Sequence, residues 1–338
     1  AEEVFLNPKF SDPELDKVKK EVEGEILEQK GNDMAQAAYH HTRFFYGQHP
    51  YGNPVLGTQR GIKLLIFKDI QDYYKSNYGD PRLALFGTGD VKKQVVEKWF
   101  ENLREKLNKK NPKVKPSIDI PKPQDFEGRQ VLLVNKPKAT QSQVYIGGIG
   151  NRPEHKDFFT IQLANYSFGG HSFNAKLMQE LRVKRGWTYG ASCNFRFGRQ
   201  PKHYSIFFFP KTADTLPAIK LALQLLEDFK DKGVTAEEFK LARNSLINNA
   251  PFNYDTAKKR LENSTQEFLL QFPKNYFKDF GKQIEKVSQE DTVPALKQFI
   301  KTENLKITVL GDAAKLKPEL QKLLGKKVQI KVKNYLED

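Results

Sequence analysis

Two side chains near the middle of the chain could act together on a peptide. Arg182 and Tyr189 are seven residues apart in the stretch from His171 to Gly198. A guanidinium and a phenol aimed at one spot can both donate hydrogen bonds to a peptide carbonyl. The structural alternative is that Arg182 caps helix carbonyls and Tyr189 packs on an apolar strand face, as amphipathic side chains often do. The local pattern leaves both roles open.

A helix and the strand after it would position this pair. Apolar residues at helical spacing predict a helix from the start of the stretch to about Arg182, and Gly186 provides the stop. From Trp187 to Phe197, apolar and polar residues alternate, which predicts a strand with one apolar face. Tyr189 falls on the apolar side of that alternation. We expect the turn between the two elements to bring Arg182 and Tyr189 together.

Two carboxylates on a helix near the N-terminus form a second candidate site. The helix is predicted to start with Asp12 as its N-cap and Pro13 in its first turn. Its predicted buried stripe has four apolar members, Leu15, Val18, Val22 and Ile26. Glu21 and Glu28 flank this stripe, two turns apart on the same side. Such a pair could help to bind a metal or could simply reach water, because burying it unpaired would be costly.

The histidines do not form a metal-ligand set by their spacing. His40 and His41 are adjacent, and neighbours on a helix point about 100° apart, so they are a poor ligand pair. His49 belongs to a His-Pro-Tyr-Gly segment that predicts an ordered loop. The sequence therefore offers carboxylates for a metal, without a matching set of histidines.

Composition narrows the class of protein. A length of 338 residues suggests two domains of ordinary size. The net charge of +15 permits attraction to anionic partners, yet no basic–aromatic nucleic-acid motif occurs, so we expect no nucleic-acid partner. Cys193 is the only cysteine, which rules out an internal disulfide. No run of 18 apolar residues is present, so we expect no transmembrane helix.

An internal repeat predicts how the chain is organised. Asp69–Asp90 is echoed by Asp291–Asp312, at an offset of 222 residues. Both copies predict a helix, a short buried strand, a Gly-Asp turn and another helix, and Leu83–Phe86 is the strand of the first copy. Self-similarity at a long period indicates two copies of one α/β unit, so residues 12–107 should lie on residues 236–324.

The repeat and a proline-rich stretch give the expected domain boundaries. Residues 1–110 form the back half of a first domain, 111–127 a linker rich in proline and lysine, and 128–338 a complete second domain. The offset places the start of the first copy about a hundred residues before Ala1, and the chain does not begin with methionine. We therefore expect the first domain to be incomplete at its N-terminus.

The sequence resembles peptidase family M16, which includes pitrilysin, insulysin and mitochondrial processing peptidase. The resemblance covers nearly the whole chain. It implies an α+β fold of duplicated α/β sandwich domains, with largely antiparallel sheets and helices packed on one face. The segments that carry it are Phe168-Gly169-Gly170, Leu177, Leu181-Arg182, Lys184 to Gly190, Glu21-Val22, Glu28, His49-Pro50-Tyr51-Gly52, Gly57 and both Gly-Asp turns.

The resemblance implies a zinc-dependent peptidase that encloses a peptide or an unfolded polypeptide. Members hold zinc with an inverted His-x-x-Glu-His motif and with a Glu on a later helix. Glu28 matches that third ligand, and Glu21 matches an orienting acid seven residues before it. Arg182 and Tyr189 match, in type and spacing, a pair in the opposite half that holds the substrate backbone.

One departure from the family pattern leaves three hypotheses. No His-x-x-Glu-His occurs among the six histidines. The chain is then part of an M16-like zinc metalloendopeptidase cut off after that motif, a dedicated Arg/Tyr subunit working with a zinc-bearing M16-like subunit, or a non-catalytic structural homologue. This chain alone is not expected to be catalytic, because zinc needs three protein ligands and only Glu28 is in place. The compartment stays open, and both bacterial periplasm and cytoplasm are compatible with the sequence.

Overall fold

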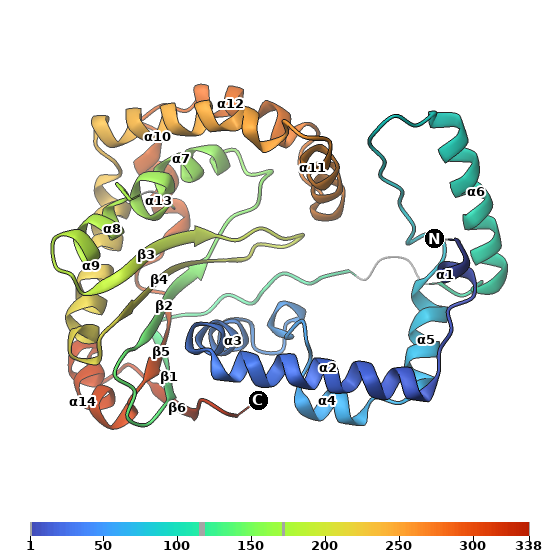
Figure 1. Cartoon of the computed structure of the whole chain (residues 1–338). Helices are drawn as coiled ribbons and strands as arrows, with labels where there is room; N and C mark the ends of the chain where they lie inside the picture. The colour runs from blue at the N-terminus through green and yellow to red at the C-terminus, as the bar shows by residue number, and fades with distance from the viewer. Residues whose placement is uncertain (1, 115–118, 171–172, 338) are drawn as a thin grey trace.

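A computed structural model describes residues 2–114, 119–170 and 173–337. Figure 1 shows an open, curved molecule, with a sheet and its covering helices on the left and an arm of helices that runs below them to the right. The arm consists of the elements between Glu2 and Lys110, and the sheet is built from residues 130–334.

The arm contains only helices in its described residues. They are α1 (Glu2–Leu6), α2 (Asp12–Gly31), α3 (Asp33–Tyr46), the 3-10 turn η1 (Pro50–Gly52), α4 (Gln59–Leu64), α5 (Phe67–Asn77) and α6 (Lys93–Lys110). The expected strand at Leu83–Phe86, part of the first copy of the repeat, is therefore wrong. The segment pairs with no strand, and Leu85 is 38% exposed. A strand exists only where a neighbour takes up its backbone hydrogen bonds, and residues 2–114 supply none.

Helix α2 differs from the prediction in its cap and in its burial. Ser11, one residue before Asp12, is the N-cap, and its hydroxyl accepts a hydrogen bond from the Glu14 amide at 3.4 Å. Of the predicted buried stripe only Ile26 is fully buried, and Val18 is 49% exposed. The stripe stays largely open because α3 and α4 are the main elements that cover this helix.

One six-stranded sheet forms the centre of the second part of the chain, which follows the arm. Its strands are β1 (Gln130–Asn135), β2 (Gln143–Ile149), β3 (Thr188–Phe195), β4 (His203–Pro210), β5 (Lys306–Gly311) and β6 (Ile330–Asn334). Their order is β3-β4-β2-β5-β1-β6. The pairs β3–β4, β4–β2 and β2–β5 are antiparallel, whereas β1 runs parallel to both β5 and β6. The expected mixed α/β fold with a mostly antiparallel sheet is thus confirmed.

The remaining helices follow or connect these strands. They are α7 (Phe158–Gly169), α8 (Lys176–Met178), the π-helical segment η2 (Gln179–Val183), the 3-10 turn η3 (Thr212–Asp214), α9 (Thr215–Lys232), α10 (Ala236–Asn249), the 3-10 turn η4 (Ala250–Asn253), α11 (Ala257–Leu270), α12 (Tyr276–Glu285), α13 (Thr292–Phe299) and α14 (Ala313–Leu324). Sequence patterns missed α12 and β6. Helix α14 begins at Ala313, where the Asp312 carboxylate accepts a hydrogen bond from the Ala314 amide. In the described part of the chain, no helix is long and apolar enough to cross a membrane.

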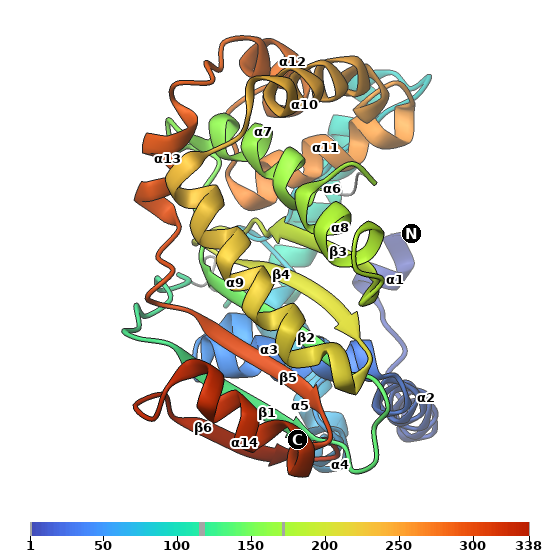
Figure 2. The same cartoon turned by 90° about the vertical axis from the view of Figure 1, so that its left-hand side faces the viewer.

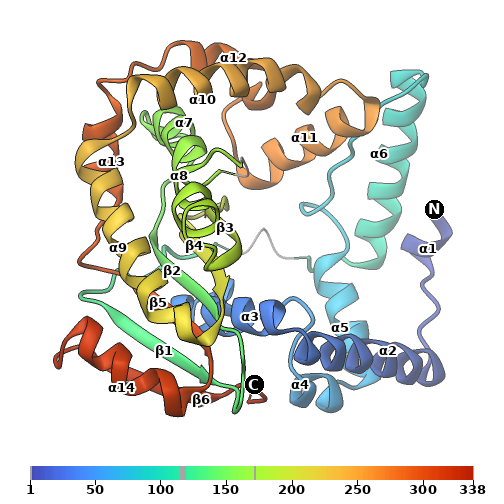
Figure 3. The ribbon, with the colours of Figure 1, turned by 60° about the vertical axis from the view of Figure 1, so that its left-hand side comes forward.

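The two faces of the sheet are covered by different parts of the chain. Figure 2 looks onto the face that α9 and α14 cover, and the main apolar core lies between this face and the helices α7, α9 and α13. Figures 1 and 3 show α3 on the opposite side, against β2 and β5. The second part thus places its own helices on one face, as expected, and the arm supplies α3 for the other.

Helix α3 is joined to the sheet by apolar and aromatic contacts. Ala37 is fully buried beside Tyr145, and the imidazole of His41 stacks on the Tyr145 ring with centroids 5.1 Å apart. His41 Nδ1 lies 3.0 Å from the hydroxyl of Thr308 on β5. His40 Nε2 lies 3.2 Å from the Tyr335 carbonyl instead, so the adjacent histidines diverge as the helix geometry predicted.

Burial keeps this interface free of charge on its histidines. His41 is 1% exposed, and burial, helped by the positive charges of Arg196 and Lys306, lowers its pKa to about 3. Burial also lowers the pKa of His203, whose ring lies 5.3 Å from that of His41. An imidazolium at either position would lose its hydration and would be repelled by the charge of Arg196.

This interface predicts a pH dependence of stability. His41 takes up a proton near pH 6.5 in the unfolded chain but only near pH 3 in the folded one, so the unfolded state binds more protons between these values. Stability should therefore fall as the pH drops below 6.5. Between pH 7 and 5 the loss from His41 should be about 2 kcal/mol. Denaturant unfolding at both pH values measures it.

Two variants at the contact between His41 and Thr308 separate the effect of His41 protonation from the effect of losing the contact. His41→Gln removes the titrating group, so its loss of stability between pH 7 and 5 should be smaller by about 2 kcal/mol. Thr308→Val breaks the same contact but keeps the imidazole, so it should retain the full loss. Equal pH dependence in His41→Gln and the unmodified chain would contradict a neutral, buried His41.

Candidate functional site

Arg182 lies in an irregular helical turn. Segment η2 is π-helical, and the Lys184 amide donates to the Gln179 carbonyl, five residues back, at 3.0 Å. The helix stops at Gly186, which has φ +64° and donates to the Arg182 carbonyl at 2.8 Å. Regular helix begins only at Lys176, later than expected, and His171 with the residue after it lies outside the described residues. Single π-turns of this kind are frequent at functional sites.

Tyr189 lies in a β-bulge near the start of β3. Thr188 pairs with Pro210 and Ala191 with Phe208, so β3 has one residue more than β4 between these points. The extra residue shifts the alternation. Thr188 takes the buried position and Tyr189 is 77% exposed. The expectation that Tyr189 shares the apolar face is therefore wrong, because bulges re-aim side chains.

The two irregularities bring Arg182 and Tyr189 into contact. The Arg182 guanidinium carbon lies 4.8 Å from the centre of the Tyr189 ring and 5.1 Å from that of Phe173. Arg182 is half-buried. In the described part of the chain, neither side chain makes a hydrogen bond or an ion pair. Aromatic faces thus orient the guanidinium and leave its N–H groups available.

The other cations of this turn are already paired. Lys184 lies 2.6 Å and Arg185 2.7 Å from the Glu180 carboxylate, and the hydrogen bond from Lys184 is the main reason that the pKa of Glu180 is lowered. Arg185 also lies over the Trp187 ring. Sequence patterns did not indicate Phe173 as a partner of Arg182. At helical spacing from other apolar residues, Phe173 was interpreted as a core residue of the predicted helix. Whether Arg182 and Tyr189 hold a substrate stays a prediction.

The carboxylate pair lies elsewhere, on the arm. Glu21 and Glu28 are both exposed on α2, and Figure 1 shows this helix apart from the start of β3. The residues that the structure describes include no group of three or more His, Cys, Asp or Glu side chains that could hold a metal ion. Glu21 and Glu28 are therefore not part of such a group within the described residues. The roles of Glu28 as a zinc ligand and Glu21 as an orienting acid stay predictions.

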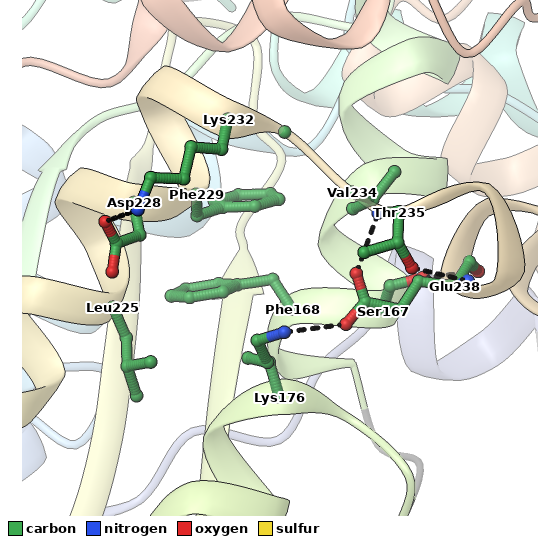
Figure 4. Close-up of a pocket in the computed structure, with 11 residues that line it drawn as sticks. Ser167, Phe168, Lys176, Leu225, Asp228, Phe229, Lys232, Val234, Thr235 and Glu238 are labelled. Carbon is green, nitrogen blue, oxygen red and sulfur yellow. Dashed lines mark hydrogen bonds and ion pairs between the residues drawn. The ribbon is translucent and has the colours of Figure 1, made fainter.

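A pocket between α7, α9 and α10 has its charges paired internally. It has a volume of about 270 Å³, and the stacked rings of Phe168 and Phe229 form part of its wall (Figure 4). Lys176 lies 2.9 Å from Glu238, and Lys232 forms an ion pair with a neighbouring aspartate. With its cations neutralised, this pocket has little to offer a charged ligand.

Comparison with known proteins decides the family. Residues 65–246, more than half of the chain, match the family described as "Peptidase M16 inactive domain". The chain belongs to this family. The M16 resemblance inferred from sequence motifs is thus confirmed. Family membership does not show hydrolysis by this chain.

Individual relatives are distant but cover most of the chain. A "Non-peptidase homolog YmxG" of Helicobacter pylori is 22% identical over 93% of this M16 chain and 71% of its own length. An "Uncharacterized zinc protease YmxG" of Bacillus subtilis is 22% identical over 79% of this chain and 64% of its own length. A crystal structure of a peptidase M16 inactive domain from Pseudomonas fluorescens has a TM-score of 0.81 at 20% identity and covers 92% of this chain and 73% of that one. These likenesses confirm the fold.

The donor set predicts that this chain alone does not hold zinc tightly. A tetrahedral site needs three protein ligands. His41 is bonded to Thr308, and His49 is held between the Pro121 carbonyl and the Tyr51 amide. Metal analysis after dialysis against trace zinc should find far less than one zinc per chain. A tightly held, stoichiometric zinc would contradict this, and loss of that zinc in a His40, His41 or His49 variant would identify the ligand.

Proposed function

We propose that this chain binds an extended polypeptide by its backbone, and that Arg182 and Tyr189 make this contact. We call these two side chains the grip. The observation that carries the proposal is the exposed Tyr189 ring beside a guanidinium that has no carboxylate partner among the described residues. Two donors that face solvent side by side suit an acceptor that comes from outside the chain.

A backbone carbonyl is the acceptor that fits this pair best. Every residue of a peptide carries a carbonyl, so a guanidinium and a phenol can hold substrates of many sequences. An extended peptide leaves these groups free, whereas a folded protein uses them internally. The proposed ligand is therefore an unfolded or extended polypeptide.

Local backbone irregularity supports a functional role for the pair. The π-turn of η2 and the bulge of β3 both interrupt regular hydrogen bonding within a few residues of each other. Without the bulge, the alternation would place the Tyr189 ring on the buried face. Bulges and π-turns are concentrated next to functional sites, where they re-aim side chains.

In this proposal the chain does not hydrolyse the peptide by itself. Its described residues hold no metal-ligand group, and the first of the relatives above carries the name of a non-peptidase. If the bound peptide is cleaved, the catalytic groups come from a partner subunit or from a longer form of the chain. Arg182 and Tyr189 would then align the peptide and stabilise charge that develops on its carbonyl.

A second candidate is that the chain is part of a longer zinc peptidase. Glu21 and Glu28 favour it, because both are exposed on one helix at the spacing that the family uses. The name of the Bacillus subtilis relative also refers to a zinc protease. In this case the Arg182–Tyr189 grip would keep the same role, since holding the backbone does not depend on where the metal lies.

Peptide binding tests the grip. Arg182→Ala removes charge-assisted hydrogen bonds and should weaken binding of a labelled, extended peptide roughly 10- to 100-fold. Tyr189→Phe keeps the ring over the guanidinium but removes the hydroxyl, and should weaken binding roughly fivefold. Fluorescence anisotropy measures both. Melting temperatures should stay unchanged, because neither side chain fills the core.

Arg185→Ala is the matched control. It removes a guanidinium from the same turn, but one that already pairs with Glu180, so it should leave peptide affinity unchanged. Unchanged affinity in Arg182→Ala and Tyr189→Phe, together with lower melting temperatures, would show that the two residues are structural.

A further inference from the structure

A cationic pocket lies where the arm meets the sheet. It has a volume of about 370 Å³ and is lined by α3, the segment from η1 to Leu56, and the residues that join β3 to β4. Its walls carry three cations, Arg43, Arg196 and Lys202, and no aspartate or glutamate. Arg43 comes from the arm, whereas Arg196 and Lys202 come from the sheet, so the pocket exists only because these two parts meet.

Aromatic rings, and not carboxylates, support two of these cations. The Arg43 guanidinium carbon lies 5.4 Å from the centre of the Tyr39 ring, and Lys202 Nζ lies 4.7 Å from that of Tyr51. In residues 2–114, 119–170 and 173–337, none of the three cations forms an ion pair with a carboxylate. Contacts with ring faces hold the charged groups in place while their hydrogen-bond donors stay available.

The positive charges also act on one another. Burial, with a further contribution from the Arg196 charge, lowers the pKa of Lys202. The same guanidinium adds to the lowering of the pKa of His203, which burial dominates. Like charges that lie close together repel one another, and the partial burial of Lys202 weakens the screening of this repulsion by water. An anion that enters the pocket would relieve this repulsion.

The pocket is aligned with the proposed grip. Tyr189 lies near the start of β3 and Arg196 directly follows its end, seven residues later, which corresponds to roughly 23 Å along an extended chain. Strand β3 is an edge strand, because β4 is its only partner among the described residues. Cys193 and Phe195 are buried on the helix-covered side, so Arg196 alternates to the other side.

We propose that this pocket binds a carboxylate of the polypeptide that the Arg182–Tyr189 grip holds, about seven residues away along the peptide. The proposal rests on the proposed function, since it assigns a second contact to the same ligand. The carboxylate comes from an acidic side chain or from the peptide C-terminus, because both present the same two oxygens to Arg196 and Lys202. The Tyr51 ring would pack against the methylene groups next to the bound carboxylate.

Three peptides of about twelve residues test the pocket and separate the two sources. The first peptide has one glutamate, blocked ends and otherwise uncharged residues. The second peptide is the same except that glutamine replaces the glutamate. The third peptide also carries this glutamine, but its C-terminal carboxylate is free. The unmodified chain should bind the first or the third peptide about tenfold or more tightly than the second, the scale of one charge-assisted hydrogen bond. The peptide with the higher affinity shows whether the bound carboxylate comes from a side chain or from the C-terminus.

A pair of double variants with equal charge change provides the control. Arg196→Gln with Lys202→Gln should abolish the preference for the carboxylate and leave binding of the uncharged peptide intact. Lys220→Gln with Lys240→Gln removes two exposed lysines outside the pocket and should keep the preference. If the first double variant keeps the preference, or if both lose it equally, the pocket is not the carboxylate site.

The outcome also separates this proposal from the grip. Arg182→Ala should weaken all three peptides alike, whereas the pocket variant should change only the preference. A preference that survives in Arg182→Ala, with affinity for the uncharged peptide unchanged, would support the pocket and contradict the grip. Absence of any preference in the unmodified chain, with the grip variants still defective, would overturn the pocket alone.

Discussion

The rest of the structure depends on one contact, the packing of α3 on the face of the sheet that the second part leaves uncovered. Ala37 and His41 bury against Tyr145 and Thr308, and no other described helix of the arm packs as closely on the sheet. A charge on His41 is disfavoured at this interface, because burial and the positive charges of Arg196 and Lys306 lower the pKa of its imidazole. The cationic pocket lies at the border of this interface. One contact therefore joins the arm to the sheet and also borders the pocket that we propose to bind a carboxylate.

Much of the second part of the chain was predictable because its signals are local, although α12 and β6 were missed. Alternating strands, apolar helix stripes and caps such as Thr235 with Glu238 define elements without knowledge of the rest of the fold. The arm was less predictable. Leu83–Phe86 has the composition of a buried strand, but a strand is a property of a pair of segments, and the described residues of the arm offer no second segment.

The candidate site was predictable in its residues and not in its geometry. The spacing of Arg182 and Tyr189 is visible in the sequence, but the face that Tyr189 takes depends on one extra residue in β3, which the clean alternation conceals. Gly190 beside Tyr189 was the only local sign of a bulge. The cationic pocket gave no sequence signal, because Arg43 and Arg196 are 153 positions apart and meet only through the docking of α3.

The central claim is that an exposed guanidinium–phenol pair holds a polypeptide backbone. A crystal structure of the chain with a bound, extended peptide tests it most directly. The account predicts a peptide carbonyl within hydrogen-bond distance of the Arg182 guanidinium and the Tyr189 hydroxyl, with the peptide following the edge of β3. A well-ordered peptide bound elsewhere, with Arg182 and Tyr189 still in contact only with each other and with Phe173, would contradict it.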